Sequence, residues 1–246
     1  MKKILGYIFS PLQFLTFAIF LLIFHPLQWL GLKLGGYSAH KRVVDILNFF
    51  LVGTYYCAGC VVRYINPYNL PLNRSIIFVA NHQSVYDIPP MIWFLRKYHA
   101  KFISKIELTK GIPSISFNLL HGGGANIDRK DPKQSITEIL KFAGRMRQNN
   151  WSAIIFPEGT RTKTGKMKPF ALGGISTLLK KVPDALVVPI AIQGSWELTK
   201  YGTYPLNFGQ GITYTVLEPI EPAGKTNEEV IAEAEEKIKN VVEGAA

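Results

Sequence analysis

The stretch Ser75-Ile-Ile-Phe-Val-Ala-Asn81-His82-Gln83-Ser84-Val85-Tyr86-Asp87-Ile88-Pro89-Pro90 joins an apolar run to a polar turn and then to a Pro-Pro pair. The apolar run is continuous rather than alternating, which is typical of a strand covered on both faces of a sheet. The prolines suit the first turn of a helix, where a missing backbone N–H costs little. A buried strand that leads through a polar turn into a helix predicts an α/β fold with its chemistry at the strand end.

Apolar runs and helical patterns alternate along the chain from residue 61 onward. We expect strands at 61–65, 75–80, 101–104, 153–156, 185–192 and 211–217, and helices at 89–98, 112–120, 132–148 and 171–181. Asp131-Pro132 is a typical helix start, and Thr226 with Glu229 forms a capping box for a last helix. The predicted fold class is α/β, with a mostly buried mixed sheet flanked by helices.

The N-terminal part has a different character. Between Ile4 and Leu32 no residue is charged when His25 is counted as neutral, and residues 4–24 are nearly continuous Ile, Leu and Phe. Twenty-one helical residues reach about 30 Å, which is the thickness of the hydrocarbon layer of a membrane. The run is too long for a signal peptide and lacks a small-residue cleavage site. A second uncharged run, 46–62, follows a polar connection at 35–45.

Three arrangements of these two apolar runs are open. If both crossed a membrane, the basic residues of the connection would lie opposite those of the N-terminus, which the positive-inside rule disfavours. A helical hairpin inserted from one side keeps all of them on the cytoplasmic face, and we favour it. The alternatives are one or two true spans, or two buried helices of a soluble core. We therefore expect a membrane-associated hairpin at residues 1–60 and an α/β domain at 61–246.

The charge balance points to an anionic partner. The 246 residues are 48% hydrophobic and 18% charged, which excludes a disordered chain, and the formal net charge is +11. A surplus of this size suits nucleic acid, an acidic membrane surface or a phosphorylated substrate. Residues 101–168 alone hold 13 Lys and Arg against five acids. The aromatic residues lie mainly in apolar runs rather than between basic ones, so nucleic acid is the partner we least expect.

Two motifs suggest chemistry that the rest of the sequence does not support. Cys57 and Cys60 have the spacing of a redox or metal pair, but they lie in an apolar run without a second cluster of ligands, so we interpret them as packing residues. His121-Gly-Gly-Gly124 resembles the oxyanion loop of a lipase, yet no Gly-x-Ser-x-Gly sequence accompanies it. We therefore expect neither a metal site nor a serine hydrolase.

His82 and Asp87 are the first candidates for catalysis. On one helix a separation of five residues would place them about 140° apart, so a hydrogen bond between them requires the strand-to-helix turn. Asp87 would then fix the tautomer of the imidazole and leave its other nitrogen as a general base. The alternative is a capping aspartate beside an unrelated loop histidine, and these residues alone leave both interpretations open.

A second apolar strand ends in Pro157-Glu-Gly-Thr-Arg161, followed by Lys163, Lys166 and Lys168. Arginine can bind an anion through two parallel hydrogen bonds, and glycine lets the backbone come close to it. The spacing of Gly159 and Lys166 does not fit a Walker A loop. This turn therefore predicts an anion site of another kind.

Taken together, four short blocks resemble the glycerolipid acyltransferases. Asn81-His82 through Asp87 is similar to their HX4D motif, and Ile127-Asp128-Arg129 is similar to their second block. Phe156–Arg161 and Val188-Pro189-Ile190 resemble the third and fourth, in the same order and with similar spacing. The resemblance covers roughly residues 60–195 and is strongest to members that acylate lysophosphatidic acid (1-acylglycerol 3-phosphate).

The resemblance implies a mechanism and a set of site residues. His82 would remove the proton from the sn-2 hydroxyl of the acceptor, and Asp87 would hold His82, so that phosphatidic acid forms without a serine or cysteine nucleophile. Lys105 would contact the phosphate or the developing oxyanion, and Pro189 would be structural or face the acyl chain. The residues implied in binding the acceptor phosphate are Arg129, Glu158, Gly159, Thr160 and Arg161.

The same resemblance implies the partners. The acyl donor would be a thioester of acyl carrier protein or coenzyme A, used as a substrate, with no bound cofactor and no metal. The hairpin would hold the chain on anionic lipid at the cytoplasmic face of a bacterial inner membrane. Two other functions stay open: acylation of another lysolipid or of glycerol 3-phosphate, and lipid binding without catalysis.

Overall fold

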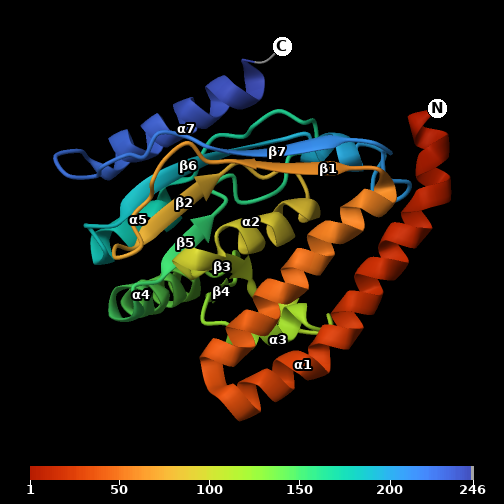
Figure 1. Ribbon diagram of the computed structural model, residues 1–246. Coiled ribbons are helices and arrows are strands. Elements are labelled where there is room, and N and C mark those ends of the chain that lie inside the picture. Colours follow the sequence, from red (N-terminus) through yellow and green to blue (C-terminus); the bar gives the residue numbers. More distant parts are fainter. Residues whose placement is uncertain (245–246) are drawn as a thin grey trace.

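The computed structural model describes residues 1–244 and is built around a seven-stranded mixed sheet (Figure 1). The strands lie in the order β1-β7-β6-β2-β5-β3-β4, and every neighbouring pair is parallel except β6 with β7. Their bounds are β1 Val61–Ile65, β2 Ile76–Ala80, β3 Ala100–Lys105, β4 Ala125–Ile127, β5 Ser152–Ile155, β6 Leu186–Gln193 and β7 Gly211–Val216. The mixed α/β class expected from the sequence is therefore confirmed.

Helices cover both faces of this sheet. The α-helices are α1 Lys2–Gly53, α2 Ile88–Phe94, α3 Ile115–His121, α4 Pro132–Asn149, α5 Leu172–Lys181, α6 Ser195–Thr199 and α7 Asn227–Glu243. Short 3-10 helices are η1 Thr54–Ala58, η2 Val85–Asp87, η3 Arg96–Tyr98 and η4 Ile106–Thr109. Helices α4, α5 and α7 cover one face, whereas α1 and α2 lie on the other (Figure 1).

Strand β2 is central and contributes to both cores, as its continuous apolar sequence predicts. Its residues Ile77 and Val79 pack in the core formed with α4, α5 and α7. Ile76, Phe78 and Ala80 pack in the opposite core, which includes residues of α2 and η1. All five side chains are fully buried, and burial of each of the larger ones contributes about 1.5–3 kcal/mol. The turn that follows β2 is thus attached to a strand that is buried along its whole length.

The sequence predicted the longer elements well and missed the shortest ones. The strand β4 and the helix α6 were not expected, because three and five residues are too few to show a periodic pattern. The helix expected at 89–98 is divided into α2 and η3. The two predicted helix starts are confirmed: Asp131 accepts from the backbone N–H of Gln134, and Thr226 and Glu229 form both hydrogen bonds of a capping box.

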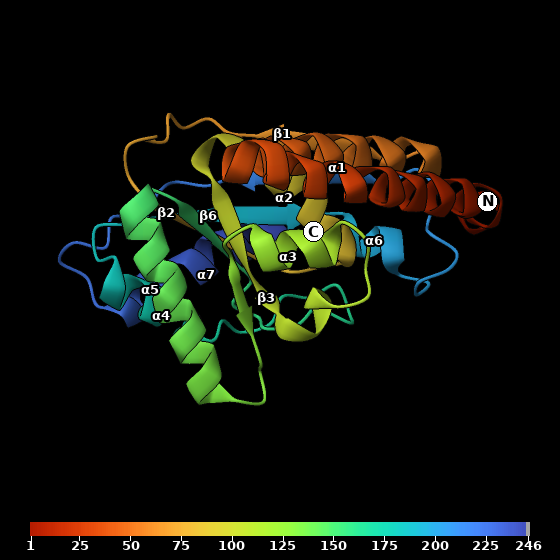
Figure 2. The ribbon, with the colours of Figure 1, turned by 90° about the horizontal axis from the view of Figure 1, so that it is seen from below.

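Helix α1 is a bent pair of arms, a first arm (residues 2–35) and a return arm (residues 37–53). Figures 1 and 2 show both arms on the same side of the molecule, with the chain reversing direction between them. The bend is at Gly36, the only residue of α1 with a non-helical backbone (φ 63°, ψ −158°), a conformation that favours glycine. The polar connection expected at 35–45 is helical except at Gly36, because the chain needs only one glycine to turn. Beyond the bend, His40 and Val44 are buried and keep this segment helical.

The second apolar run, residues 46–62, is divided among three elements rather than forming one helix. Its first part completes the return arm, its middle forms η1, and Val61 and Val62 begin β1. The helical segment Lys2–Ala58, which comprises α1 and η1, is long and apolar enough to cross a membrane by length and composition alone.

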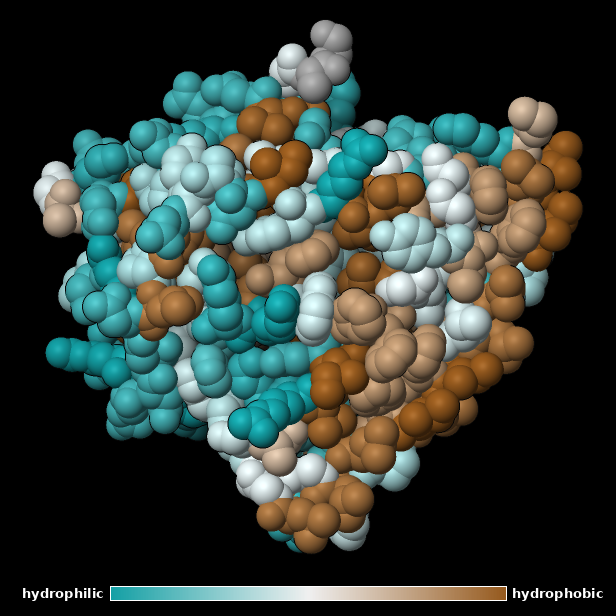
Figure 3. Space-filling model, viewed as in Figure 1, coloured by the Kyte–Doolittle hydropathy of each residue, from teal (hydrophilic) through white to brown (hydrophobic). Residues whose placement is uncertain are grey.

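The first arm exposes a stripe of apolar side chains and buries three polar ones beside the apolar Leu21 and Phe24. Its exposed stripe includes Ile4, Ile8, Leu15, Leu22 and Leu34, each more than half exposed. Its buried face carries Ser10, Gln13 and Gln28, which are almost completely covered. Figure 3 shows the resulting apolar band along α1, next to a hydrophilic surface over the rest of that view. An exposed apolar band of this extent indicates a surface that meets lipid or another apolar partner.

Candidate active site

The polar turn after β2 is fixed to the neighbouring strand β6 by Asn81. The Asn81 side chain donates from Nδ2 to the carbonyl of Ile192 at 2.9 Å and accepts from its backbone N–H at 2.7 Å. Asn81 is buried, so these two bonds are shielded from competing water. Ser84 caps the following 3-10 helix η2, which carries Asp87. The turn is therefore held at both ends.

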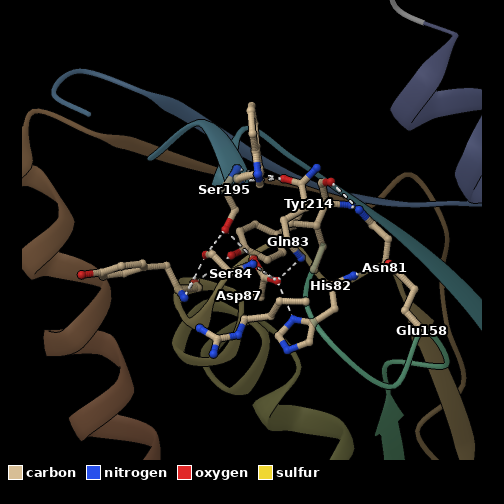
Figure 4. A network of polar contacts seen from close by, with 12 residues as sticks. Asn81, His82, Gln83, Ser84, Asp87, Glu158, Ser195 and Tyr214 are labelled. Atoms are coloured by element: carbon tan, nitrogen blue, oxygen red, sulfur yellow. Dashed lines mark hydrogen bonds and ion pairs between the residues drawn. The ribbon is translucent and has the colours of Figure 1, made fainter. Parts of the chain in front are cut away.

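This turn brings His82 and Asp87 together. His82 Nδ1 lies 2.8 Å from Asp87 Oδ2, which also accepts from the backbone N–H groups of Gln83 at 2.7 Å and Ser84 at 2.9 Å (Figure 4). Asp87 is fully buried, whereas the His82 side chain is 15% exposed. An ionised carboxylate is an acceptor only, so Nδ1 carries the proton and Nε2 is the nitrogen free to accept one. This is the geometry of a general base oriented by a buried carboxylate.

The His82 ring is also held from the second motif. It stacks on Phe156, with 4.1 Å between ring centroids and 7° between ring planes. Phe156 follows β5, the neighbour of β2 in the sheet. The imidazole is therefore fixed by a hydrogen bond in its plane and by an aromatic contact on its face.

The loop after β5 is hydrogen-bonded directly to the turn after β2. Glu158 accepts from the backbone N–H of His82 at 2.7 Å and from that of Lys168 at 3.0 Å. The Thr162 N–H donates to the His82 carbonyl at 2.9 Å. Burial raises the pKa of Glu158, and its hydrogen bonds to the backbone oppose that shift. Both Glu158 oxygens thus accept from backbone N–H groups, so Glu158 links the loop after β5 to the turn after β2.

Cationic side chains from three neighbouring strands are attached to the same edge of the sheet. Because β2, β5, β3 and β4 are parallel, their carboxyl ends meet at one edge. Lys105 is the last residue of β3 and pairs with Ile127, the last residue of β4. Arg129 follows Ile127 by two residues, and Arg161 lies in the loop after β5. Lys105, Arg129 and Arg161 are all exposed. This edge therefore combines a histidine base with positive charge suited to an anionic substrate.

The remaining predicted site residues are Gly159 and Thr160 in the loop after β5 and Pro189 in β6. Thr160 accepts from the Lys168 ammonium group at 2.7 Å, and the same group donates to the Arg161 carbonyl at 2.9 Å. Gly159 has a positive φ of 71°, which glycine adopts without strain. Pro189 is buried within β6 next to Val79, so it belongs to the sheet interior rather than to the exposed edge.

The part of the chain that carries this arrangement matches a known protein family. The family model described as "Acyltransferase" matches residues 61–193, more than half of the chain, and the match includes the turn after β2 and the loop after β5. The chain belongs to the acyltransferase family. The family resemblance inferred from the four sequence blocks is therefore confirmed.

Among curated relatives of this acyltransferase-family chain, a 1-acyl-sn-glycerol-3-phosphate acyltransferase of Cocos nucifera is 34% identical over 124 residues, half of this chain and 39% of the relative. The protein of that name from Helicobacter pylori is 37% identical over 133 residues, 51% of this chain and 54% of the relative. The human beta form is 27% identical over 203 residues, 82% of this chain and 70% of the relative. The chain spans 38% to 46% of the length of the first three relatives.

A solved structure has the same fold. The crystal structure of the 1-acyl-sn-glycerophosphate (LPA) acyltransferase from Thermotoga maritima matches with a TM-score of 0.78 and 23% identity, over all of this chain and 98% of the other. The match includes the bent helix α1 as well as the sheet. The arrangement of α1 against the α/β body is thus shared with a known member of this fold.

Sequence reasoning missed several residues of the acyltransferase-family site. Ser195 contacts Asp87, and Gln83 accepts from the backbone N–H groups of Ser195 and Trp196. The signal was available in part, since Ser195 lies two residues beyond the end of β6 and strand ends at one edge of a sheet tend to share a site. Both cysteines are free, and residues 1–244 contain no group of three or more His, Cys, Asp or Glu placed to hold a metal ion.

Proposed function

We propose that this chain transfers an acyl group from an acyl thioester to the sn-2 hydroxyl of lysophosphatidic acid and so forms phosphatidic acid. The observation that carries the proposal is the His82–Asp87 pair, 2.8 Å apart, at a sheet edge lined with cations in a member of the acyltransferase family. The relatives named as 1-acyl-sn-glycerol-3-phosphate acyltransferases support the choice of acceptor.

In the proposed reaction His82 acts as the general base. Its Nε2 takes the proton of the acceptor hydroxyl while the oxygen attacks the thioester carbonyl, and the buried charge of Asp87 stabilises the imidazolium that forms. A C–O bond forms, the C–S bond breaks, and the leaving thiolate takes the proton back from His82. The acyl donor is acyl carrier protein or coenzyme A in thioester form. It is a substrate, so the reaction needs no bound cofactor.

The acceptor phosphate is proposed to bind at the cationic edge of the sheet. Arg161 and Arg129 each offer a planar pair of N–H donors, which suits phosphate better than a single ammonium group does. Gly159 and Thr160 supply a close backbone and a hydroxyl in the same loop. Lys105 at the end of β3 is proposed to meet either the phosphate or the charge that develops on the carbonyl oxygen.

Helix α1 is proposed to hold this site at the cytoplasmic face of a bacterial inner membrane. The first arm is about 50 Å long and has basic residues at both ends, Lys2 and Lys3 at one and Lys33 at the other. Insertion with the bend leading would carry Lys33 and Arg42 into hydrocarbon, which is costly. The bend at Gly36 places these basic residues at the tip of the hairpin, so we replace the inserted hairpin expected from the sequence with an arm lying in the plane of the interface. This arrangement keeps both ends at anionic headgroups and buries the exposed apolar stripe.

An acceptor panel tests the proposed function against its alternatives. The purified chain in phospholipid vesicles is given acyl carrier protein or coenzyme A thioesters with lysophosphatidic acid, other lysolipids or glycerol 3-phosphate, and products are identified by mass spectrometry. We expect phosphatidic acid to form fastest. A preference for another acceptor would keep the acyl transfer but replace the substrate. Lipid binding without any product would point to the non-enzymatic alternative.

Replacing Arg161 with alanine should weaken acceptor binding more than turnover. Removing a hydrogen-bonding partner of a charged group costs about 1.5–3 kcal/mol, so the KM for lysophosphatidic acid should rise at least about tenfold. We expect kcat to change by less than about threefold, because Arg161 is proposed to bind the acceptor phosphate rather than the reacting hydroxyl. The measurement is initial rate against acceptor concentration.

Lys163→Ala is the matched control for this prediction. Lys163 is another exposed cation of the same loop, two residues further on. Its removal lowers the local charge by the same amount without removing the proposed phosphate contact, so KM should rise only slightly. Equal KM values in wild type and Arg161→Ala would remove Arg161 from the phosphate site.

A further inference from the structure

The two oxygens of Asp87 have different partners. Oδ2 accepts from His82 and from two backbone N–H groups, as described above. Oδ1 accepts from the hydroxyl of Ser195 at 2.5 Å, a residue 108 positions away in the chain. Figure 4 shows Asp87 between Ser195 on one side and His82 on the other. The carboxylate is therefore held from two directions.

The proton positions in this network follow from the chemistry of its members. A carboxylate can only accept, so Ser195 must donate its one proton to Asp87. The hydroxyls of Ser195 and Ser84 also contact each other, and since the Ser195 proton is already used, Ser84 is the donor there. The Ser84 oxygen in turn accepts from the backbone N–H of Tyr86 at 3.1 Å. The result is a chain of hydrogen bonds that all point toward Asp87, and such chains strengthen each member.

Ser195 is itself held firmly in place. The Gln83 side chain accepts from the backbone N–H groups of Ser195 at 3.0 Å and Trp196 at 3.1 Å. The preceding residue, Gly194, has φ 81°, and a Cβ atom there would lie 2.0 Å from the Gly211 carbonyl oxygen. Ser195 is fully buried. Its hydroxyl thus has one orientation set by the turn that carries His82 and by the end of β6.

We propose that Ser195 is a positioning residue for the general base, acting on His82 through Asp87. This inference rests on the proposed function. The Ser195 hydroxyl fixes the plane of the carboxylate so that Oδ2 faces His82 Nδ1, and it takes up part of the negative charge. Without it, the carboxylate is free to rotate, and the uncompensated charge holds the proton of the imidazolium more tightly.

The ionisable groups around Asp87 allow a clear pH readout. They are His82, the phenols of Tyr55 and Tyr214, and Glu158, which lies against the backbone of His82. Burial, and secondarily the charge of Asp87, raises the pKa of Tyr214 well above its usual value. Both phenols donate to the Tyr86 carbonyl. The acid limb of the pH–rate profile therefore reports on the His82 side of the network rather than on these tyrosines.

The test is Ser195→Ala, measured as a full pH–rate profile of acyl transfer to lysophosphatidic acid. We expect kcat to fall about tenfold, with the acceptor KM changed by less than about twofold. The acid limb should move to higher pH, because the uncompensated charge of Asp87 favours the imidazolium. Ser195→Cys, a nearly isosteric variant with a weaker donor, should lie between alanine and wild type.

Ser152→Ala is the matched control. Ser152 is also almost fully buried and its hydroxyl accepts from the backbone N–H of Ile76, at the opposite end of β5. Ser152→Ala should be destabilised about as much as Ser195→Ala in thermal unfolding, but its kcat and the acid limb of its pH–rate profile should not change. If Ser152→Ala changed kcat and the acid limb as much as Ser195→Ala does, the role of Ser195 would be merely structural and the inference would be overturned.

A second readout does not depend on the acceptor. Proton NMR of the purified chain in micelles should show a low-field resonance from the His82 Nδ1 proton, identified by its loss in His82→Ala. In Ser195→Ala this resonance should shift or exchange faster with water. An unchanged resonance would overturn the inference even if no acyl transfer is observed. Active wild type with an unchanged Ser195→Ala profile would overturn it and leave the proposed function standing.

Discussion

His82→Ala is expected to lower the rate of acyl transfer to lysophosphatidic acid by about a thousandfold. The imidazole is the only base fixed by a carboxylate at this edge of the sheet within residues 1–244, since Glu158 has both oxygens engaged by backbone N–H groups. An alanine leaves the hydroxyl of the acceptor without a proton acceptor, while the proposed phosphate site remains. The effect should therefore lie in kcat rather than in the acceptor KM, measured as initial rates of phosphatidic acid formation.

His121→Ala is the control for this substitution. His121 ends α3, is exposed and packs only against Phe117 among the aromatic side chains, so it makes the same chemical change away from the proposed base. It should retain nearly all activity. Thermal unfolding should show that both variants are folded. Comparable rates for His82→Ala and wild type would refute the general-base mechanism.

The central part of the site could be predicted because its information is local. Residues 75–90 contain the buried strand, the proposed base His82, its partner Asp87 and the prolines of the next helix in one continuous stretch. The requirement that His82 and Asp87 meet through a turn rather than along a helix also followed from their spacing. The structure places their atoms 2.8 Å apart.

The supporting contacts could not be predicted because they join distant strand ends. Glu158 was expected to help bind phosphate, whereas its oxygens contact the backbone of His82 and Lys168. Ser195 reaches Asp87 only because β6 lies next to β2 and both end at the same edge. One sequence shows which strands exist but not which are neighbours, so contacts between loops of non-consecutive strands stay hidden.

The N-terminal part illustrates a different limit. Apolar composition predicted two helices joined by a polar connection over 35–45, but it did not show that the chain turns at the single residue Gly36. Nor did composition show which side of the first arm faces the body. Ser10, Gln13 and Gln28 on that arm face inward, and Gln13 accepts from the Tyr86 hydroxyl at 3.3 Å. The arm is therefore joined to the residue next to Asp87, in addition to presenting an apolar surface.

Asp87→Asn is expected to lower kcat by about a hundredfold, with little change in stability. The two backbone N–H groups at Oδ2 require an acceptor there, so the asparagine oxygen should take this place and its NH2 group should face Ser195. The Ser195 hydroxyl can rotate to accept from it. The His82 tautomer is then kept, and the variant removes the negative charge alone, which is the part of Asp87 that stabilises the imidazolium.

The direction in which the pH–rate profile of Asp87→Asn shifts distinguishes the loss of its charge from a general loss of structure. Without the charge of Asp87 the imidazolium is less favoured, so the acid limb of the pH–rate profile should move to lower pH. This is opposite to the shift expected for Ser195→Ala, where the charge remains and loses a donor. Asp184→Asn, at an exposed carboxylate, should move neither limb. Shifts of the same sign in Asp87→Asn and Ser195→Ala would show that the carboxylate does not act on His82 through its charge.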